Sequence, residues 1–107
     1  MSISSVTALF ANGDEAARIA RIVVEERLAA CINILPPCRS IYRWEGRIEA
    51  SREVPAILKT AADRCDDLIA RLSQLHSYDV PAITAWPVEQ ALPAYAAWVE
   101  ESTADAR

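Results

Sequence analysis

The stretch SIYRWEGRIEASREVPAILKTAA, residues 40–62, decides the fold expected for this chain. Its first part, Ser40–Ala50, has the side-chain alternation of a strand, and its second part, Val54–Ala62, is apolar enough for a core strand. A turn around Ser51 joins the two, and Gly46 is expected to mark a bulge or a close backbone approach in the first strand. The result is an antiparallel hairpin longer than a small domain of this kind needs.

The aromatic residues of this hairpin are candidates for a cleft or a subunit interface. Tyr42 and Trp44 fall on one face of the first strand, and Trp86 belongs to a later strand. Aromatic side chains are enriched in ligand pockets and at interfaces alike. Glu45 and Lys59, if near such a cleft, could bind a small anion or a metal ion, or could act as solvated ion-pair partners.

The segments before the hairpin predict a strand, a helix and a second strand. Ile3–Ala11 alternates small polar and apolar residues, and Asn12 can cap the helix that follows, with Glu15 placed as in a capping box. The inner stripe of that helix consists of Ala16, Ile19, Ala20 and Val23. Ala30–Leu35 is nearly continuously apolar, which favours a strand covered on both faces.

The segments after the hairpin predict a helix over 63–76, a strand over Val80–Val88 and a closing helix over Pro93–Ser102. The whole order is strand, helix, strand, strand, helix, strand, with one more helix at the end. With both central helices on one face of an antiparallel sheet, this is the ferredoxin-like (split βαβ) arrangement of the α+β class. Residues 1–107 are expected to form a single domain.

Composition excludes several classes of function. The chain of 107 residues is 52% hydrophobic, with a net charge of -4, and it has no basic run of the kind that binds a nucleic-acid backbone. No apolar stretch reaches the length of a membrane span, and Met1–Ala11 lacks the pattern of a secretory signal. The charged stretch Arg47–Glu53 is interpreted as a solvated hairpin tip. A chain this small cannot bury all its apolar surface alone, so a subunit interface is expected.

The cysteines and the one histidine raise the question of a metal site. The three cysteines are odd in number and widely spaced, which suits a reducing compartment, and a cytoplasmic location is expected. Cys31, His76 and a carboxylate such as Asp79 could bind copper or another divalent cation if the fold or a neighbouring subunit brings them together. The alternative is structural: His76 ends a helix, and Cys31 is a small apolar residue of a buried strand.

Several motifs resemble those of the CutA family of divalent-cation tolerance proteins. They are Arg27–Ile34, the aromatic signature Ser40–Ile48, the strand end Leu58–Thr60, the stretch His76–Ile83 and the helix segment Tyr95–Trp98. They agree with the family in order and spacing over nearly the whole chain. The departures are Ala11–Asn12 in place of a Thr-containing turn, Ser77 for Pro, Asp79 for Glu, and Ala82 for a second Glu that would offer an oxygen ligand.

The resemblance implies a cytoplasmic, ferredoxin-like homotrimer, similar in shape to the PII nitrogen-signalling proteins and linked to tolerance of copper and other divalent metals. On this interpretation the protein is not an enzyme and its main partner is itself. One alternative is a small enzyme or ligand-binding protein with a site around His76, paired with Asp79 or Glu45. Another is an RNA-recognition module, which the acidic balance and the absence of aromatic residues from Val54–Ala62 disfavour.

Overall fold

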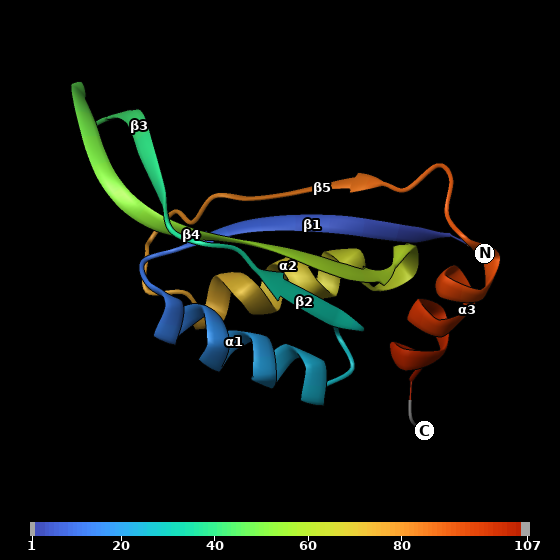
Figure 1. Ribbon diagram of the computed structural model, residues 1–107. Helices are drawn as coiled ribbons and strands as arrows, with labels where there is room; N and C mark the ends of the chain where they lie inside the picture. Colours follow the sequence, from blue (N-terminus) through green and yellow to red (C-terminus); the bar gives the residue numbers. More distant parts are fainter. Residues whose placement is uncertain (1, 106–107) are drawn as a thin grey trace.

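The computed structural model describes residues 2–105, which form one antiparallel sheet system with three α-helices (Figure 1). The elements in chain order are β1 (Ile3–Phe10), α1 (Gly13–Glu25), β2 (Cys31–Ile34), β3 (Cys38–Trp44), β4 (Arg47–Ala61), a 3-10 turn (Ala62–Arg64), α2 (Cys65–Leu75), β5 (Ile83–Pro87) and α3 (Pro93–Ser102). No helix in this described part is long and apolar enough to cross a membrane.

The strand order is that of a ferredoxin-like fold. The sheet runs β2-β4-β1-β5, all neighbours are antiparallel, and β3 pairs with the outer part of β4. Helices α1 and α2 lie side by side on one face of the sheet, whereas α3 lies near one end of it (Figure 1). The predicted α+β class and the placement of the two helices are confirmed.

The core lies between the sheet and the two helices that cover it. Alternate residues of β1 and β4 point toward the helices, so that Val6 and Leu58, which are cross-strand partners, are both fully buried. Leu68 and Leu72 of α2 meet them, as does the predicted stripe of α1. Each such large apolar side chain contributes about 1.5–3 kcal/mol by leaving water.

The start of α1 follows the predicted cap closely. The Asn12 side chain accepts a hydrogen bond from the backbone N–H of Glu15 at 2.8 Å. The Glu15 carboxylate returns to the N–H of Ala11 at 3.3 Å, one residue before the position that a standard capping box uses. These bonds satisfy backbone donors that a helix start otherwise leaves unpaired.

The hairpin turn lies at Glu45–Gly46, and the prediction that placed it around Ser51 was wrong. Both turn residues have positive φ, 49° and 78°, as a two-residue turn that matches the strand twist requires. Gly46 adopts this conformation freely, so it marks the turn and not a bulge. Ser51 lies within β4, paired with Ser40, and β4 runs unbroken for 15 residues. The hairpin therefore projects well beyond the sheet (Figure 1).

The shortest strand was also misjudged. In the described chain β2 lies at an edge of the sheet, with Asn33 and Ile34 exposed, whereas the sequence predicted a strand covered on both faces. The apolar run alone could not distinguish a central strand from an edge strand that another surface covers. At the opposite edge β5 ends at Pro87, which agrees with the prediction that its prolines lie near the strand ends or on an edge.

Candidate functional site

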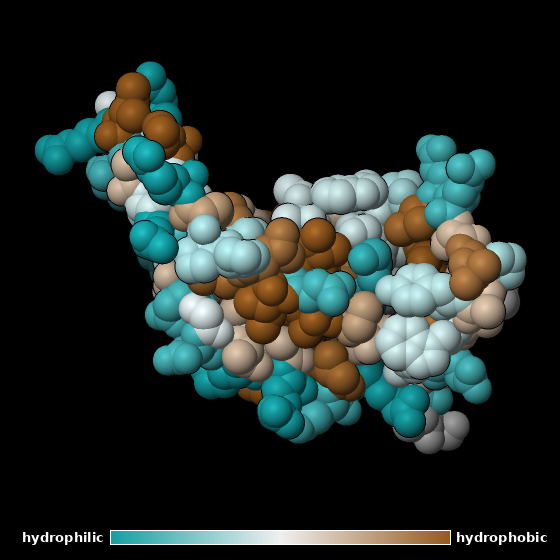
Figure 2. All heavy atoms as spheres, in the orientation of Figure 1, coloured by the Kyte–Doolittle hydropathy of each residue, from teal (hydrophilic) through white to brown (hydrophobic). Residues whose placement is uncertain are grey.

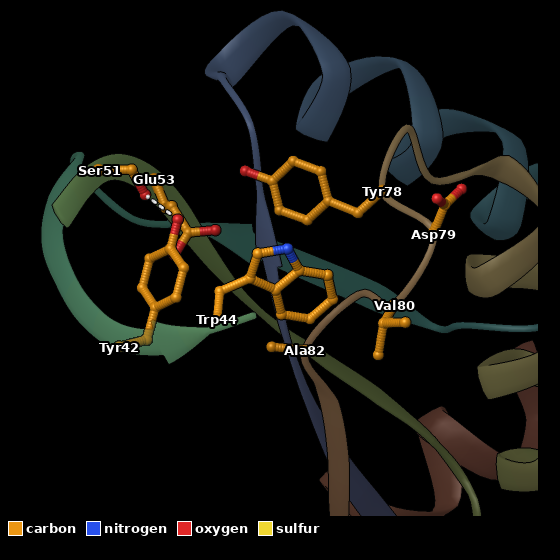
Figure 3. A pocket seen from close by; sticks show the side chains of 8 residues that line it. All are labelled: Tyr42, Trp44, Ser51, Glu53, Tyr78, Asp79, Val80 and Ala82. Atoms are coloured by element: carbon orange, nitrogen blue, oxygen red, sulfur yellow. Dashed lines mark hydrogen bonds between the residues drawn. The ribbon is translucent and has the colours of Figure 1, made fainter. Parts of the chain in front are cut away.

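A pocket of about 390 Å³ opens between the projecting hairpin and the segment that follows α2 (Figure 3). Eight residues line it: Tyr42, Trp44, Ser51, Glu53, Tyr78, Asp79, Val80 and Ala82. The hairpin strands β3 and β4 supply the first four, and the 78–82 segment supplies the others. The site therefore joins two parts of the chain that are distant in sequence.

Strand alternation places the hairpin residues on one face. Tyr42 and Trp44 are two positions apart on β3, as are Ser51 and Glu53 on β4. The register pairs Ser40 with Ser51, so both pairs project toward the same side of the hairpin. The Tyr42 hydroxyl lies 3.2 Å from the Ser51 hydroxyl, and this bond fixes the tyrosine ring at the pocket wall (Figure 3).

His76 anchors the other wall. Its Nε2 donates to the carbonyl of Leu9 at 2.7 Å, and its Nδ1 accepts the backbone N–H of Tyr78 at 3.1 Å. The ring also stacks on Phe10, with centroids 5.1 Å apart and an interplanar angle of 12°. Since a carbonyl can only accept and an N–H can only donate, these bonds define the neutral tautomer with hydrogen on Nε2. The histidine thus positions the backbone from which Tyr78 reaches the pocket.

The buried carboxylate of Glu15 lies next to His76. Glu15 accepts hydrogen bonds from Ser77 and from Ala11, and its Oε1 lies 3.9 Å from Nδ1 of His76. Burial acts to raise the pKa of Glu15, but the hydrogen bonds from Ser77 and Ala11 outweigh it and lower the pKa below its usual 4.5. The start of α1 and the segment after α2 are tied together through this one side chain.

The pocket is acidic and aromatic. Burial, first, and the neighbouring carboxylate of Glu53 raise the pKa of Tyr78 to about 12. Glu53 itself is only 7% exposed. Asp79 adds a second carboxylate, and none of the eight lining residues is Lys, Arg or His. The lining thus combines the aromatic rings of three residues with two carboxylates, a composition that suits a small-molecule site.

Comparison with known proteins assigns the family. The family model described as CutA1 divalent ion tolerance protein matches residues 4–102. The chain belongs to this family. Its pocket and its anchor both lie within the matched range, so the resemblance expected from the sequence motifs is confirmed.

Individual relatives agree with this assignment. The divalent-cation tolerance protein CutA of Thermus thermophilus is 39% identical over 102 residues, covering 94% of this chain and 99% of that protein. Mouse protein CutA is 41% identical over 95% of this chain, which spans only 58% of the mouse protein's length. The crystal structure of CutA from Xylella fastidiosa superimposes with a TM-score of 0.94 at 35% identity, covering 97% of this chain and all of that one.

The structure separates the residues that the sequence nominated for a cleft. Tyr42 and Trp44 line the pocket, but Glu45 lies exposed at the hairpin turn. Lys59 and Trp86 pair with the same β1 residue, Ser5, in a row across the sheet. Lys59 lies six positions after Glu53 on β4, which corresponds to about 20 Å along a strand. Neither Lys59 nor Trp86 belongs to the pocket.

The proposed metal ligands do not meet within one chain. Cys31 pairs with Lys59, and its Sγ lies 3.5 Å from the hydroxyl of Tyr95. His76 is bonded to Leu9, four positions along β1 from the Cys31 row, and Asp79 lines the pocket. Across residues 2–105 no three His, Cys, Asp or Glu side chains are grouped so that they could hold a metal ion. Both nitrogens of His76 are also occupied by protein partners.

Sequence reasoning missed the acid at the centre of the site. The stretch Arg47–Glu53 was interpreted as a solvated tip, and this is wrong for Glu53, which is buried against Tyr78. Tyr78 and Ser51 were not nominated either. A signal was present: once the turn is placed at Glu45–Gly46, Glu53 falls opposite Cys38, close to the body of the domain and not at the tip.

Proposed function

We propose that this protein is a non-enzymatic homotrimer that acts in the tolerance of divalent cations, copper among them. The family assignment supports the link to divalent cations, and the expected trimer comes from the family resemblance. The observation that carries self-association is the projecting hairpin of β3 and β4. In a single chain this two-stranded ribbon exposes apolar side chains that a second copy would cover.

The exposed residues lie on the face of the hairpin that points away from the pocket. Ile41 and Ile48 are 70% and 71% exposed, and apolar residues gather on the projecting hairpin in Figure 2. The outer edge of β3 pairs with no strand of the described chain. An isolated two-stranded hairpin is marginally stable in water, and an open apolar edge favours pairing with another chain. Association with a second copy would stabilise the hairpin and would cover its open edge.

Native mass spectrometry and light scattering test the assembly. The expected particle has three times the chain mass of 11.8 kDa. The double variant Ile41→Asp, Ile48→Asp should shift the protein toward monomer, because burying two carboxylates in an interface is costly. Val24→Asp, at a half-exposed position of α1, is the matched control and should leave the mass unchanged. A wild-type monomer would contradict the proposal.

Copper binding needs a separate measurement. Cys31, His76 and Asp79 do not fit a metal site in one chain, so a stoichiometric copper ion would require ligands from more than one subunit. One equivalent of Cu(II) per chain, added before native mass spectrometry, tests this. Uptake that disappears in Cys31→Ser but persists in Cys65→Ser would support a shared site. Uptake indifferent to both cysteines would exclude Cys31 as a ligand.

A second candidate function is the reading of a small ligand, as in PII-like signalling. The observation that favours it is the open pocket between the hairpin and the 78–82 segment, because ligand sites are mostly apolar concavities with a few placed polar groups. A small molecule that is released when the purified protein is diluted could be identified by mass spectrometry. A pocket that releases nothing and binds nothing would oppose this function.

The cytoplasm is the location that we propose. The three cysteines are free thiols in the structure, which suits a reducing compartment. Among the relatives, the solved protein from Archaeoglobus fulgidus is described as periplasmic, and one from Arabidopsis thaliana as chloroplastic. Fractionation of source cells with an antibody to the native protein tests the proposal, and recovery outside the cytoplasmic fraction would contradict it.

A further inference from the structure

The buried carboxylate of the pocket lacks a counter-charge. Glu53 is only 7% exposed, and it lines the pocket beside Tyr78. Within residues 2–105 the ion pairs join other groups, and no Lys, Arg or His nitrogen lies within 4.0 Å of Glu53. A carboxylate has about four acceptor positions, and a buried charge is costly unless it is paired. Glu53 therefore retains capacity for a cation.

Three aromatic rings surround this acid. Tyr42 and Trp44 come from β3, and Tyr78 comes from the opposite wall. In Figure 3 the Trp44 indole lies between the hairpin and the 78–82 segment, and the Tyr78 hydroxyl points toward the hairpin. The face of an aromatic ring carries partial negative charge and attracts cations, most strongly for Trp. Ring faces beside an acid are typical of sites that bind organic ammonium groups.

The charges of the hairpin favour the same ligand. The register places Glu49 on the pocket side of β4, opposite Tyr42, and Arg47 on that side at the tip, outside the lining. The other hairpin arginines, Arg39, Arg43 and Arg52, project from the opposite side by strand alternation. The mouth of the pocket is thus more acidic than the hairpin as a whole.

We propose that this pocket binds a small organic cation with an alkylammonium head. The ammonium group would lie against Trp44 and Tyr42 and near the carboxylate of Glu53, with Val80 and Ala82 against the apolar part of the ligand. Asp79, whose carboxylate points away from Trp44 in Figure 3, adds negative potential at the rim. The volume of about 390 Å³ is within the range of small-molecule sites. This function is separate from the tolerance of divalent cations.

Other ligand classes fit the lining less well. Calcium needs six to eight oxygen ligands and magnesium an octahedral set, whereas the lining supplies only the carboxylates of Glu53 and Asp79 and three hydroxyl groups. An anion would be repelled by Glu53 and Asp79, since no basic side chain lines the pocket. A neutral apolar molecule would leave the Glu53 carboxylate without a cationic partner.

Isothermal titration of the 107-residue protein with choline tests the proposal. The control ligand is 3,3-dimethylbutan-1-ol, which has the shape of choline but no charge. We expect choline to bind and the neutral alcohol to bind at least about tenfold more weakly, because cation–π and charge attraction are lost together. Equal binding of the two would show an apolar cavity only and would overturn the proposal. Failure of choline to bind would also overturn it.

Variants locate the binding. Glu53→Gln keeps the shape of the side chain and should weaken choline at least about tenfold, whereas Glu49→Gln removes an equal charge outside the lining and should change the affinity less than about twofold. Trp44→Leu should also abolish measurable binding. Circular dichroism establishes that each variant is folded. If Glu53→Gln does not fold, the choline affinities of Trp44→Leu and Asp79→Asn test the site instead. Unchanged affinity in Trp44→Leu would overturn the proposal.

Discussion

His76 lies 2.7 Å from the carbonyl oxygen of Leu9 and donates to it through Nε2. The bond joins the end of α2 to the end of β1, and the other ring nitrogen holds Tyr78 through its backbone N–H. Both ring nitrogens of the one histidine in the chain therefore form hydrogen bonds that hold the pocket wall in place.

Removal of the imidazole should destabilise the protein. His76→Ala loses two hydrogen bonds and the stack on Phe10, and it leaves the Tyr78 N–H and the Leu9 carbonyl without these partners. We expect a loss of about 2–4 kcal/mol in the free energy of unfolding, measured by urea denaturation at fixed protein concentration. His76→Gln can retain a donor toward Leu9 and should cost less. Equal losses in the two variants would mean that the Leu9 bond contributes little.

The lowered pKa of Glu15 makes stability depend on acidity. A carboxylate whose folded pKa is below its unfolded value of 4.5 stabilises the fold above that pH, and the contribution is lost as the pH falls through the folded pKa. Glu15→Gln removes this contribution and part of the helix cap, at a cost of about 1 kcal/mol near neutral pH. The difference between wild type and variant should shrink on acidification. A difference that is constant with pH would contradict the assigned ionisation.

The hairpin turn predicts opposite effects at its two residues. Gly46→Ala places a Cβ at φ 78° and should cost about 1 kcal/mol. Glu45→Asn, at φ 49°, introduces a residue that tolerates positive φ and should raise stability slightly. Urea midpoints of the two variants measure both effects. Two shifts in the same direction would be inconsistent with a turn that needs positive φ at both positions.

Two tyrosines should ionise unusually late. The pKa of Tyr78 is raised to about 12 by burial and by Glu53, and that of Tyr95 to about 12 by burial and by Cys31. Because the folded state favours the neutral phenols, their contribution to stability is complete below the unfolded pKa of 10 and is lost as the pH rises toward 12. Absorbance titration of tyrosinate measures this.

Phenylalanine variants assign the two groups. Tyr78→Phe and Tyr95→Phe should each remove one late-titrating phenol and leave the other in place. A full tyrosinate signal near pH 10 in the folded wild type would contradict both environments.

The fold was largely predictable because local signals agreed with each other. The cap at Asn12, the stripe of α1 and the proline at the start of α3 are chemical features that act within one turn of helix. The hairpin turn was missed because Glu at its first position is an uncommon type I′ residue, although Gly46 carried the signal.

The site was less predictable because its parts meet only through tertiary packing. Tyr42 and Trp44 stood out as aromatics, but nothing local shows that Tyr78 lies beside Glu53, which is 25 positions earlier in the sequence. Glu53 looked solvated because its neighbours in the sequence are charged. Its burial depends on the segment that His76 holds in place.

The hairpin turn sets which face of β3 lines the pocket. Both β2 and β3 lie along the same side of β4, with Pro36–Pro37 between Cys31–Ile34 and Cys38–Trp44, and the turn at Glu45–Gly46 fixes the register of β3 with β4. Residues added at the tip, beyond Trp44 and Arg47, would lengthen the ribbon and leave the pocket intact. One residue added beside the prolines would be taken up in the link between β2 and β3, because the two-residue turn at Glu45–Gly46 holds β3 in register with β4. The reach of the ribbon can therefore vary between related sequences while Tyr42 and Trp44 keep facing the pocket.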